Sequence, residues 1–254
     1  AENNVAGVAG LAMLKAYNPK LGFDISIEKN IKPGSGIGSS AASAAGTVAG
    51  INYLLGNPFT SEELIPFAME GERLACGSAH ADNVAPAILG GFTLVRDTNP
   101  LDVVKLPTPL ELTATVIHPK IEVKTADARA VLKKRVSLET AINQWANVGA
   151  LVASLYEEDY ALLSRSLVDE IVEPARCILI PKFAQLKKAC AEAGALGSGI
   201  SGSGPSVFAL SRGMTDANKV AEAMFEVYNK TGIPFEIHVS PVKQTGVSFL
   251  EDIS

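Results

Sequence analysis

Two stretches rich in glycine and serine constrain this chain more than any other feature. Residues 34–46 read GSGIGSSAASAAG, and residues 197–206 read GSGISGSGPS. The first stretch runs into an alanine-rich segment, which predicts a helix over residues 40–55. Glycine lets backbone N–H groups approach an anion closely, and the start of a helix adds about half a positive charge. We therefore expect a phosphate-binding loop at the first stretch and a second loop that closes over it.

Other glycine-rich patterns match less well. A Walker A loop requires a lysine after the glycines, and none follows here. The dinucleotide pattern G-x-G-x-x-A matches Gly36, Gly38 and Ala41, but it demands a strand ending in an acidic residue about 20 residues on, where residues 58–63 predict a helix start. The nucleophile elbow G-x-S-x-G fails because residues 199–203 end in serine.

Composition excludes several function classes. The 254 residues are 47% hydrophobic and 19% charged, as in a folded protein with a sizeable core. The formal net charge is −5, and residues 133–135 (KKR) form the main basic cluster, so no nucleic-acid partner is expected. No apolar run reaches about 18 residues, so we expect no membrane span. Cys76, Cys177 and Cys190 show no CxxC spacing, which favours a reduced cytosolic protein over a disulfide framework or a zinc site.

Periodicity and turn residues predict a mixture of helices and strands. The composition changes over residues 100–109, which contain three prolines. We therefore expect a domain boundary there, with domains over residues 1–108 and 109–254. The mixture lacks regular βαβ repetition, which indicates the α+β class. The expected helices cover residues 5–17, 40–55, 61–74, 137–157, 159–169, 181–193 and 215–231. The expected strands cover residues 23–27, 92–95, 112–116, 207–210 and 235–240.

The two glycine-rich stretches carry a family resemblance. Residues 36–41 (GIGSSA) are similar to the phosphate-binding motif of the GHMP small-molecule kinases, and residues 199–206 (GISGSGPS) resemble the glycine-rich motif near the C-terminus of that family. Their order and separation also match. One departure is Lys32, which stands where the family often has proline, with Pro33 next to it. The resemblance implies a two-domain α+β fold, with an N-terminal domain like domain 2 of ribosomal protein S5 and a ferredoxin-like C-terminal domain.

Within the family, two further segments resemble the homoserine kinases. They are residues 80–93 (HADNVAPAILGGFT) and residues 173–176 (EPAR), and the resemblance extends over essentially the whole chain. It implies ATP- and Mg²⁺-dependent phosphorylation of the L-homoserine hydroxyl to O-phospho-L-homoserine, a step in threonine biosynthesis. Homodimers are common in the family. The rival interpretations are a GHMP kinase for another alcohol (mevalonate or shikimate), a nicotinamide-dependent oxidoreductase, and a non-catalytic small-molecule sensor.

The start of the sequence departs from the family. The chain begins Ala-Glu-Asn-Asn without an initiator methionine, and the N-L-G-x-G-F-D core that the family carries near its N-terminus is absent. In homoserine kinases that segment helps to hold the substrate amino group. We therefore expect that a further segment precedes residue 1.

The resemblance also assigns roles to individual residues. Ser40 and Glu72 are the candidate Mg²⁺ ligands, because this ion prefers hard oxygen donors. Arg129 and Arg176 would pair with the substrate carboxylate, since a guanidinium binds a carboxylate through two hydrogen bonds. The residues assigned to ATP are Asn4, Lys29, Pro33, Gly34, Ser35, Gly36, Ile37, Gly38, Ser39, Ser40, Ser201, Gly202 and Ser203.

The catalytic assignments leave one question open. His80 and Asn83 match residues that line the homoserine pocket, and Thr125 matches a position near the transferred phosphate. Asp82, Asn83, Thr125 and Arg129 are the candidate catalytic residues. Other GHMP kinases use an aspartate to accept the hydroxyl proton. If Asn83 rather than Asp82 faces the substrate, no general base stands there, and catalysis rests on alignment of the reactants.

Overall fold

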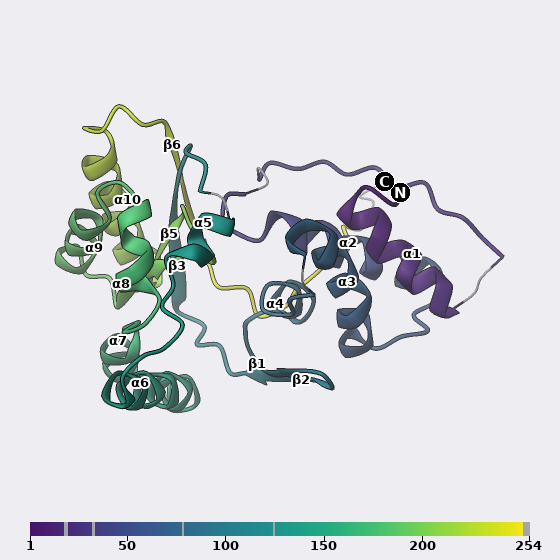
Figure 1. The fold of residues 1–254 in the computed structure, drawn as a ribbon, viewed down its shortest axis with the longest axis horizontal. Coiled ribbons are helices and arrows are strands. Elements are labelled where there is room, and N and C mark those ends of the chain that lie inside the picture. Colours follow the sequence, from purple (N-terminus) through teal and green to yellow (C-terminus); the bar gives the residue numbers. More distant parts are fainter. Residues whose placement is uncertain (18–19, 32–33, 78, 124, 251–254) are drawn as a thin grey trace. The chain divides into compact units, whose positions relative to one another are not determined.

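The computed structural model describes residues 1–254 except residues 18–19, 32–33, 78, 124 and 251–254 (Figure 1). The chain divides into two compact units. Apart from the residues just excepted, unit 1 comprises Ala1–Pro33, Gly38–Leu106 and Lys243–Ser254, and unit 2 comprises Gly34–Ile37 and Pro107–Val242. Among the described residues, no helix combines the length and the apolar character that crossing a bilayer requires.

Unit 1 is a helical cluster beside a two-stranded antiparallel sheet. Helices α1, α2 and α3 pack against one another, and α4 packs on α2 and α3. Alanines fill the α2 interface, which allows its neighbours to approach closely. The elements are α1 (Val5–Tyr17), α2 (Ser39–Leu54), α3 (Ser61–Cys76), α4 (Val84–Leu89), β1 (Phe92–Thr98) and β2 (Leu101–Leu106).

The ends of the first helices follow the capping rules. The side-chain oxygen of Asn4 accepts a hydrogen bond from Ala6 N at 2.9 Å at the start of α1. Thr60 and Glu63 form the reciprocal capping box that their spacing predicts, with Glu63 N donating to Thr60 Oγ1 and Thr60 N donating to Glu63 Oε2. These local signals fix where α1 and α3 begin.

Unit 2 contains a four-stranded antiparallel sheet in the order β4-β5-β3-β6. In register, Val116 of β3 lies opposite Phe208 of β5 and His238 of β6. This strand order, with α10 between β5 and β6, is the ferredoxin-like arrangement that was expected. The strands are β3 (Leu112–Pro119), β4 (Gly197–Ile200), β5 (Val207–Arg212) and β6 (Phe235–Pro241).

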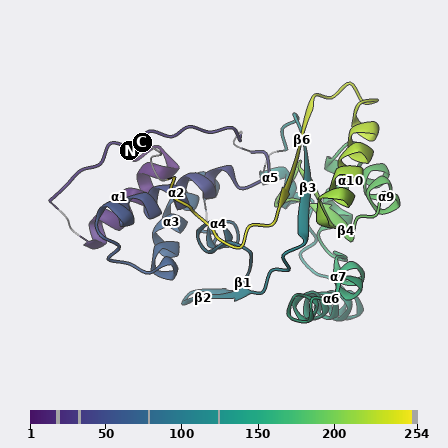
Figure 2. The same cartoon turned by 180° about the vertical axis from the view of Figure 1, so that it is seen from behind.

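Helices cover this sheet (Figures 1 and 2). α9 and α10 pack together, and their buried side chains form a core with β3 and β5. α6 packs mainly on α7. The helices of unit 2 are α5 (Thr125–Ala130), α6 (Leu138–Glu157), α7 (Tyr160–Ser166), α8 (Glu173–Arg176), the 3₁₀ helix η1 (Cys177–Leu179), α9 (Phe183–Glu192) and α10 (Gly213–Tyr228).

Two secondary-structure predictions were wrong. The strand expected over residues 23–27 does not form, because no other described segment pairs with it; Ile25 and Ile27 are exposed. Conversely, residues 197–200 are strand β4 rather than loop, because they pair with residues 207–210 of β5. Glycine weakens a strand in isolation, and here the neighbouring strand compensates.

The C-terminal segment differs from the expected division at residue 108. Residues from Lys243 onward group with unit 1 rather than with the second half of the chain. Gly91 N donates a hydrogen bond to Lys243 O at 2.7 Å, and the rings of Tyr53 and Phe249 stack with centroids 4.5 Å apart. A Cβ on Gly246 would lie 2.1 Å from Ile88 O, so the backbone there passes directly against α4.

Candidate functional site

The first glycine-rich stretch forms a loop with a regular backbone alternation. Gly34, Gly36 and Gly38 have φ values of +77°, +79° and +77°, with one residue between each pair. Such alternation turns successive N–H groups toward one side and makes an anion-binding concavity. Within the described part of the chain, no acceptor takes the N–H groups of Gly38, Ser39 or Ser40. The loop therefore offers free donors immediately before and at the start of α2.

The loop also carries an unpaired hydroxyl. Ser35 is 1% exposed, and its Oγ has no hydrogen-bond partner among the described residues. A buried hydroxyl without a partner costs about 1–3 kcal/mol, so such groups are uncommon unless a ligand completes them. Ser35 Oγ is thus a candidate ligand contact in the part of the loop that belongs to unit 2.

The second glycine-rich stretch holds Gly34–Ile37 within unit 2. Ser201 Oγ donates to Gly36 O at 2.7 Å, and Ser206 Oγ donates to Ser35 O at 2.5 Å. Gly202 and Ser203 lie in the turn that Gly204 N closes on Ser201 O at 2.9 Å. The Ser201 hydroxyl therefore donates its hydrogen bond to the first loop. In the predicted contact with ATP, Ser201 Oγ could then act only as an acceptor.

Ser206 and His118 were missed by the sequence analysis. His118 Nδ1 lies 3.1 Å from Ser206 Oγ, and both side chains are buried. Because Ser206 gives its proton to Ser35 O, the tautomer with a proton on Nδ1 suits this pair. Ser206 belongs to the glycine-rich motif of residues 199–206. His118 lies in β3, and no local sequence feature indicates that it belongs to the site.

At the start of α2, the two serines differ. Ser39 is buried and its Oγ donates to Ile31 O at 2.8 Å, while Lys29 Nζ donates to Ser39 O at 3.1 Å. Ser40 is half-buried and forms no side-chain hydrogen bond with the described residues. Ser39 is thus fixed structurally, and Ser40 keeps a hydroxyl available for a ligand.

Glu72 has the properties expected of a metal ligand. It is 3% exposed, and its Oε1 has no partner among the described residues. A Cβ on the preceding Gly71 would lie 3.3 Å from Ala44 Cβ, so α3 passes α2 one helical turn beyond Ser40 at this point. Burying a carboxylate without a partner is costly. The residues present therefore fit a divalent cation held by hard oxygen donors.

In the 80–83 segment, Asp82 and Asn83 have different surroundings. Asp82 is exposed, and its Oδ1 accepts a hydrogen bond from Asn83 N at 3.2 Å. Asn83 Oδ1 lies 4.0 Å from the position that a Cβ on Gly38 would take. The amide of Asn83 therefore faces the start of α2. His80 is half-buried and does have an interaction partner.

Arg176 is anchored inside unit 2. Its Nε donates to Ala128 O at 3.0 Å and its Nη1 donates to Gly202 O at 3.1 Å. These bonds tie α8 to α5, which carries Arg129, and to the second glycine-rich turn. Arg129 is exposed and also has a partner. Thr125 begins α5, but its side chain is not among those described.

Two further assigned residues are Asn4 and Pro33. Asn4 uses its side-chain oxygen to cap α1, which leaves its amide N–H₂ for any contact with adenine. Pro33 lies outside the described residues. Among the described residues, no group of three or more His, Cys, Asp and Glu side chains is arranged to hold a metal ion.

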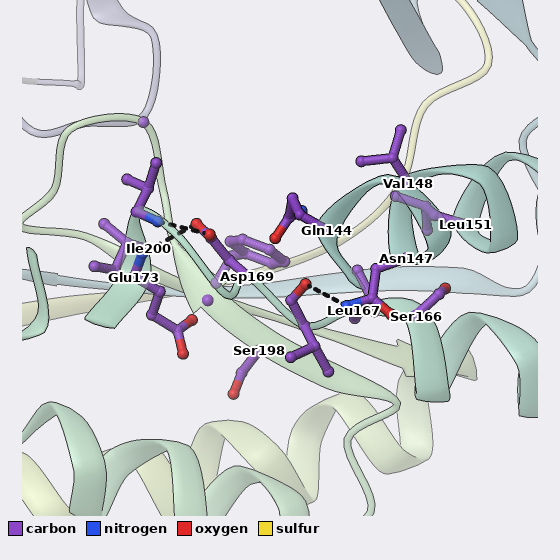
Figure 3. Close-up of a pocket in the computed structure, with 15 residues that line it drawn as sticks. Gln144, Asn147, Val148, Leu151, Ser166, Leu167, Asp169, Glu173, Ser198 and Ile200 are labelled. Atoms are coloured by element: carbon purple, nitrogen blue, oxygen red, sulfur yellow. Dashed lines mark hydrogen bonds between the residues drawn. The ribbon is translucent and has the colours of Figure 1, made fainter. Parts of the chain in front are cut away.

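A cavity of about 230 Å³ opens in unit 2 (Figure 3). Its lining includes Gln144, Leu151, Asp169 and Ser198, and Gly202 is its one predicted site residue. The Asp169 carboxylate accepts hydrogen bonds from two backbone amides, Val172 N at 2.8 Å and Ile171 N at 2.9 Å. The second glycine-rich stretch therefore forms part of the cavity wall, through Ser198, Gly199, Ile200 and Gly202.

Comparisons with known proteins agree with these features. The model of the GHMP kinases N-terminal domain matches residues 3–91, and that of the GHMP kinases C-terminal domain matches residues 151–230. The homoserine kinase of Chloroherpeton thalassium is 50% identical over 229 residues, which cover 90% of this chain and 72% of the relative. That of Chlorobium phaeobacteroides strain BS1 is 50% identical over 230 residues, with the same coverage.

A solved structure supports the same grouping. The crystal structure of homoserine kinase from Cytophaga hutchinsonii is 52% identical, matches with a TM-score of 0.93, and covers 96% of this chain and 78% of that chain. Identity at this level over most of both chains establishes common ancestry. The chain therefore belongs to the GHMP kinase family, and within it to the group formed by the homoserine kinases.

Proposed function

We propose that this protein transfers the γ-phosphoryl group of ATP to the hydroxyl of L-homoserine, producing O-phospho-L-homoserine for threonine synthesis. The observation that carries the proposal is the glycine-rich loop, where free N–H groups and the unpaired Ser35 hydroxyl precede α2. Phosphoryl transfer depends on such positioned donors more than on covalent chemistry. In this proposal the loop binds the triphosphate. Asn4 and Lys29 contribute to nucleotide binding.

The substrate assignment rests on two arginines and the 80–83 segment. Arg129 and Arg176 pair with the homoserine carboxylate, and His80 and Asn83 position the rest of the amino acid. Arg176 is already oriented by two backbone carbonyls, so its second terminal nitrogen is pre-aligned for an acceptor. Pre-orientation lowers the entropy that binding must overcome.

The reaction balances without a protein base. The homoserine hydroxyl oxygen bonds to the γ-phosphorus as the bond to the β,γ-bridging oxygen breaks, and ADP leaves. Because the Asn83 amide faces Gly38 and an amide accepts no proton, the hydroxyl proton passes to the transferred phosphate or to solvent. Thr125 and Arg129 orient the phosphate and the acceptor, and Asp82 positions Asn83 through the backbone.

Mg²⁺ is the cation that we assign to Glu72 and Ser40. When bound, it would neutralise charge on the triphosphate. Glu72 supplies the carboxylate and Ser40 the hydroxyl, and the unpaired Glu72 Oε1 supports this assignment. We also place the protein in the cytoplasm, in keeping with the unpaired thiols of Cys177 and Cys190.

Coupled ADP release tests the proposal. Purified protein with Mg²⁺ and ATP should release ADP with L-homoserine but not with mevalonate or shikimate, and ³¹P NMR should show a new phosphomonoester. ATP, unlike NAD, should raise the melting temperature. ATP binding without turnover would favour a sensor, and turnover with mevalonate alone would assign another alcohol.

A single substitution tests the carboxylate contact. Arg129→Ala should raise the KM for homoserine strongly and leave the KM for ATP nearly unchanged, because it removes only the acceptor's anchor. Arg165→Ala on α7 serves as the matched control, since this exposed arginine has no assigned role. An unchanged homoserine KM in Arg129→Ala removes that residue from the site.

A further inference from the structure

Helix α8 is too short to be stable by itself. It consists of Glu173–Arg176 and ends at one of the two arginines that we assign to the homoserine carboxylate. An isolated helical turn is unfavourable in water, because several backbone dihedral angles must be fixed for a single hydrogen bond. The position of the arginine therefore depends on the groups that hold this turn in place.

The carboxylate of Asp169 holds the chain that enters α8. Its Oδ1 accepts hydrogen bonds from Ile171 N at 2.9 Å and from Val172 N at 2.8 Å. Its Oδ2 accepts a third hydrogen bond from Glu173 N at 3.0 Å (Figure 3). Hydrogen bonds to an ionised acceptor are stronger than those between neutral groups. One side chain thus fixes three consecutive backbone amides.

The remaining backbone donors connect these amides to Arg176. Pro174 has no N–H group. The N–H groups of Ala175 and Arg176 both donate to Val172 O, at 3.1 and 3.0 Å. Every backbone N–H from residue 171 to residue 176 is therefore accounted for, by Asp169 or by Val172 O. The backbone of Arg176 is consequently placed by Asp169 through Val172.

Helix α6 fixes the peptide groups on either side of Asp169. Gln144 Oε1 accepts a hydrogen bond from Glu170 N at 2.8 Å. Asn147 Nδ2 donates to Val168 O at 3.3 Å. Asp169 is therefore held by the main chain of its neighbours, and both of its carboxylate oxygens are left for the α8 amides.

We propose that Asp169 is a positioning residue for homoserine binding, which aligns the guanidinium of Arg176 by fixing the backbone of α8. From that backbone position, Arg176 Nε reaches Ala128 O at 3.0 Å and its Nη1 reaches Gly202 O at 3.1 Å, so Nη2 keeps one orientation. Asp169 acts through Arg176 and not on the substrate itself. The inference rests on the proposed function, because that function gives Arg176 the substrate carboxylate.

Steady-state kinetics of Asp169→Ala test the inference. Without the three hydrogen bonds α8 loses its fixed start, so the KM for homoserine should rise about tenfold or more. The KM for ATP should stay nearly unchanged, because Ser201 and Ser206 still hold the first glycine-rich loop. Asp169→Asn should give an intermediate homoserine KM, since its amide oxygen can still accept two of the three hydrogen bonds.

Asp159→Ala is the matched control. Asp159 caps α7 by accepting a hydrogen bond from Leu162 N at 2.9 Å, but α7 carries no residue that we assign to the substrate. Both alanine variants should lower the melting temperature, and only Asp169→Ala should raise the homoserine KM. If Asp169→Ala raises that KM no more than the control does, Asp169 has a structural role only and the inference is wrong.

A double-mutant cycle tests whether Asp169 acts through Arg176. Arg176→Ala alone should raise the homoserine KM. Adding Asp169→Ala to that variant should change the KM little further, because the group to be positioned is already absent. Two independent, multiplying increases would contradict the inference, since Asp169 would then affect the substrate by another route.

An NMR measurement separates this inference from the proposed function. The Nε–H resonance of Arg176, assigned by its loss in Arg176→Lys, should shift in Asp169→Ala as the hydrogen bond to Ala128 O is lost. It should not shift in Asp159→Ala. The measurement needs no turnover, so it decides the inference even if the wild-type protein does not phosphorylate homoserine. A resonance at the same position in wild type and Asp169→Ala would overturn it.

Discussion

At the scale of single residues, Gly36 occupies a position that only glycine can fill. A Cβ there would lie 2.7 Å from both Ser201 O and Gly204 O, and the residue has a φ of +79°. The absent side chain is what allows the two glycine-rich loops to lie against each other within unit 2. Its role is therefore steric as well as conformational.

Gly36→Ala should damage nucleotide binding. We expect a strain of roughly 1–3 kcal/mol at this position, which moves the loop amides and raises the KM for ATP about tenfold or more. Steady-state ADP release measures the change. Gly46→Ala in α2 is the control, because a Cβ there meets nothing within 4 Å and alanine favours a helix. Equal ATP KM values in the two variants would show that the loop geometry is not needed for binding.

Glu72→Gln tests the proposed metal ligand. The substitution keeps the shape of the side chain but removes the charge, so the Mg²⁺ concentration at half-maximal rate should rise at least about tenfold. Titrating the rate with Mg²⁺ at fixed ATP measures it. Glu70→Gln on the same helix changes an exposed carboxylate that pairs with Arg73, and it should leave the Mg²⁺ requirement unchanged. If both variants show the same requirement, Glu72 is not a ligand.

The candidate site was predictable where short motifs carry the chemistry. The positive-φ glycines and the half-buried Ser40 at the start of α2 follow from the GSGIGSSA spacing, because glycine adopts positive φ without steric cost and serine favours helix starts. His118 and the buried state of Glu72 were not predictable, since each depends on which distant segment packs beside it. Likewise, nothing local shows that Ser201 and Arg176 form hydrogen bonds to backbone carbonyls of distant segments.

At the scale of elements, helices with strong end signals and the starts of β1, β3, β5 and β6 were predicted closely, whereas residues 23–27 and 197–200 were not. The capping box at Thr60 and the alanine-rich α2 have local causes, so their ends lie within a residue or two of the prediction. Residues 23–27 alternate as a strand would, yet a strand also needs a neighbour for its backbone groups. The short β4 shows the converse, since pairing with β5 makes a strand out of GSGI.

Helix α9 places a thiol where it cannot react. Cys190 is fully buried, and burial raises the pKa of its thiol to about 11. At pH 8 about one molecule in a thousand would therefore carry the thiolate. Iodoacetamide should modify the half-buried Cys177 first and reach Cys190 only after unfolding in urea. Peptide mass spectrometry measures the labelling of each cysteine in a Cys76→Ser variant, and Cys177→Ser is the control. Rapid labelling of Cys190 in the native protein would show that α9 opens readily.

At the scale of the whole molecule, the chain does not divide at one point. The first half ends its own unit at Leu106, but the segment from Lys243 returns to that unit and packs on α4 and Tyr53. Lys105 Nζ also donates to Gln244 O at 3.4 Å. The sequence placed the boundary within two residues of Leu106, but the returning segment has no composition that marks it.

Removing residues 243–254 should destabilise unit 1. The truncation removes the hydrogen bond from Gly91 N, the Tyr53–Phe249 ring contact and the cover over Ile88. We expect a loss of roughly 2–4 kcal/mol, comparable to removing one or two large packed side chains. Urea unfolding measures the loss of stability, and amide hydrogen exchange of the native protein shows where it occurs. Exchange should accelerate in α2 and α4 but not in α10. Uniform acceleration in both units would mean that the segment stabilises more than its own unit.

The returning segment also sets an order of events during biosynthesis. A ribosome makes residues 1–106 before residues 243–250, so the segment that covers their fold is translated only after all of residues 107–242. The nascent N-terminal half therefore stays incompletely covered until residues 243–250 have left the ribosome, while the sheet of the second half can already assemble. A chaperone that binds apolar surface would find its longest opportunity in that interval.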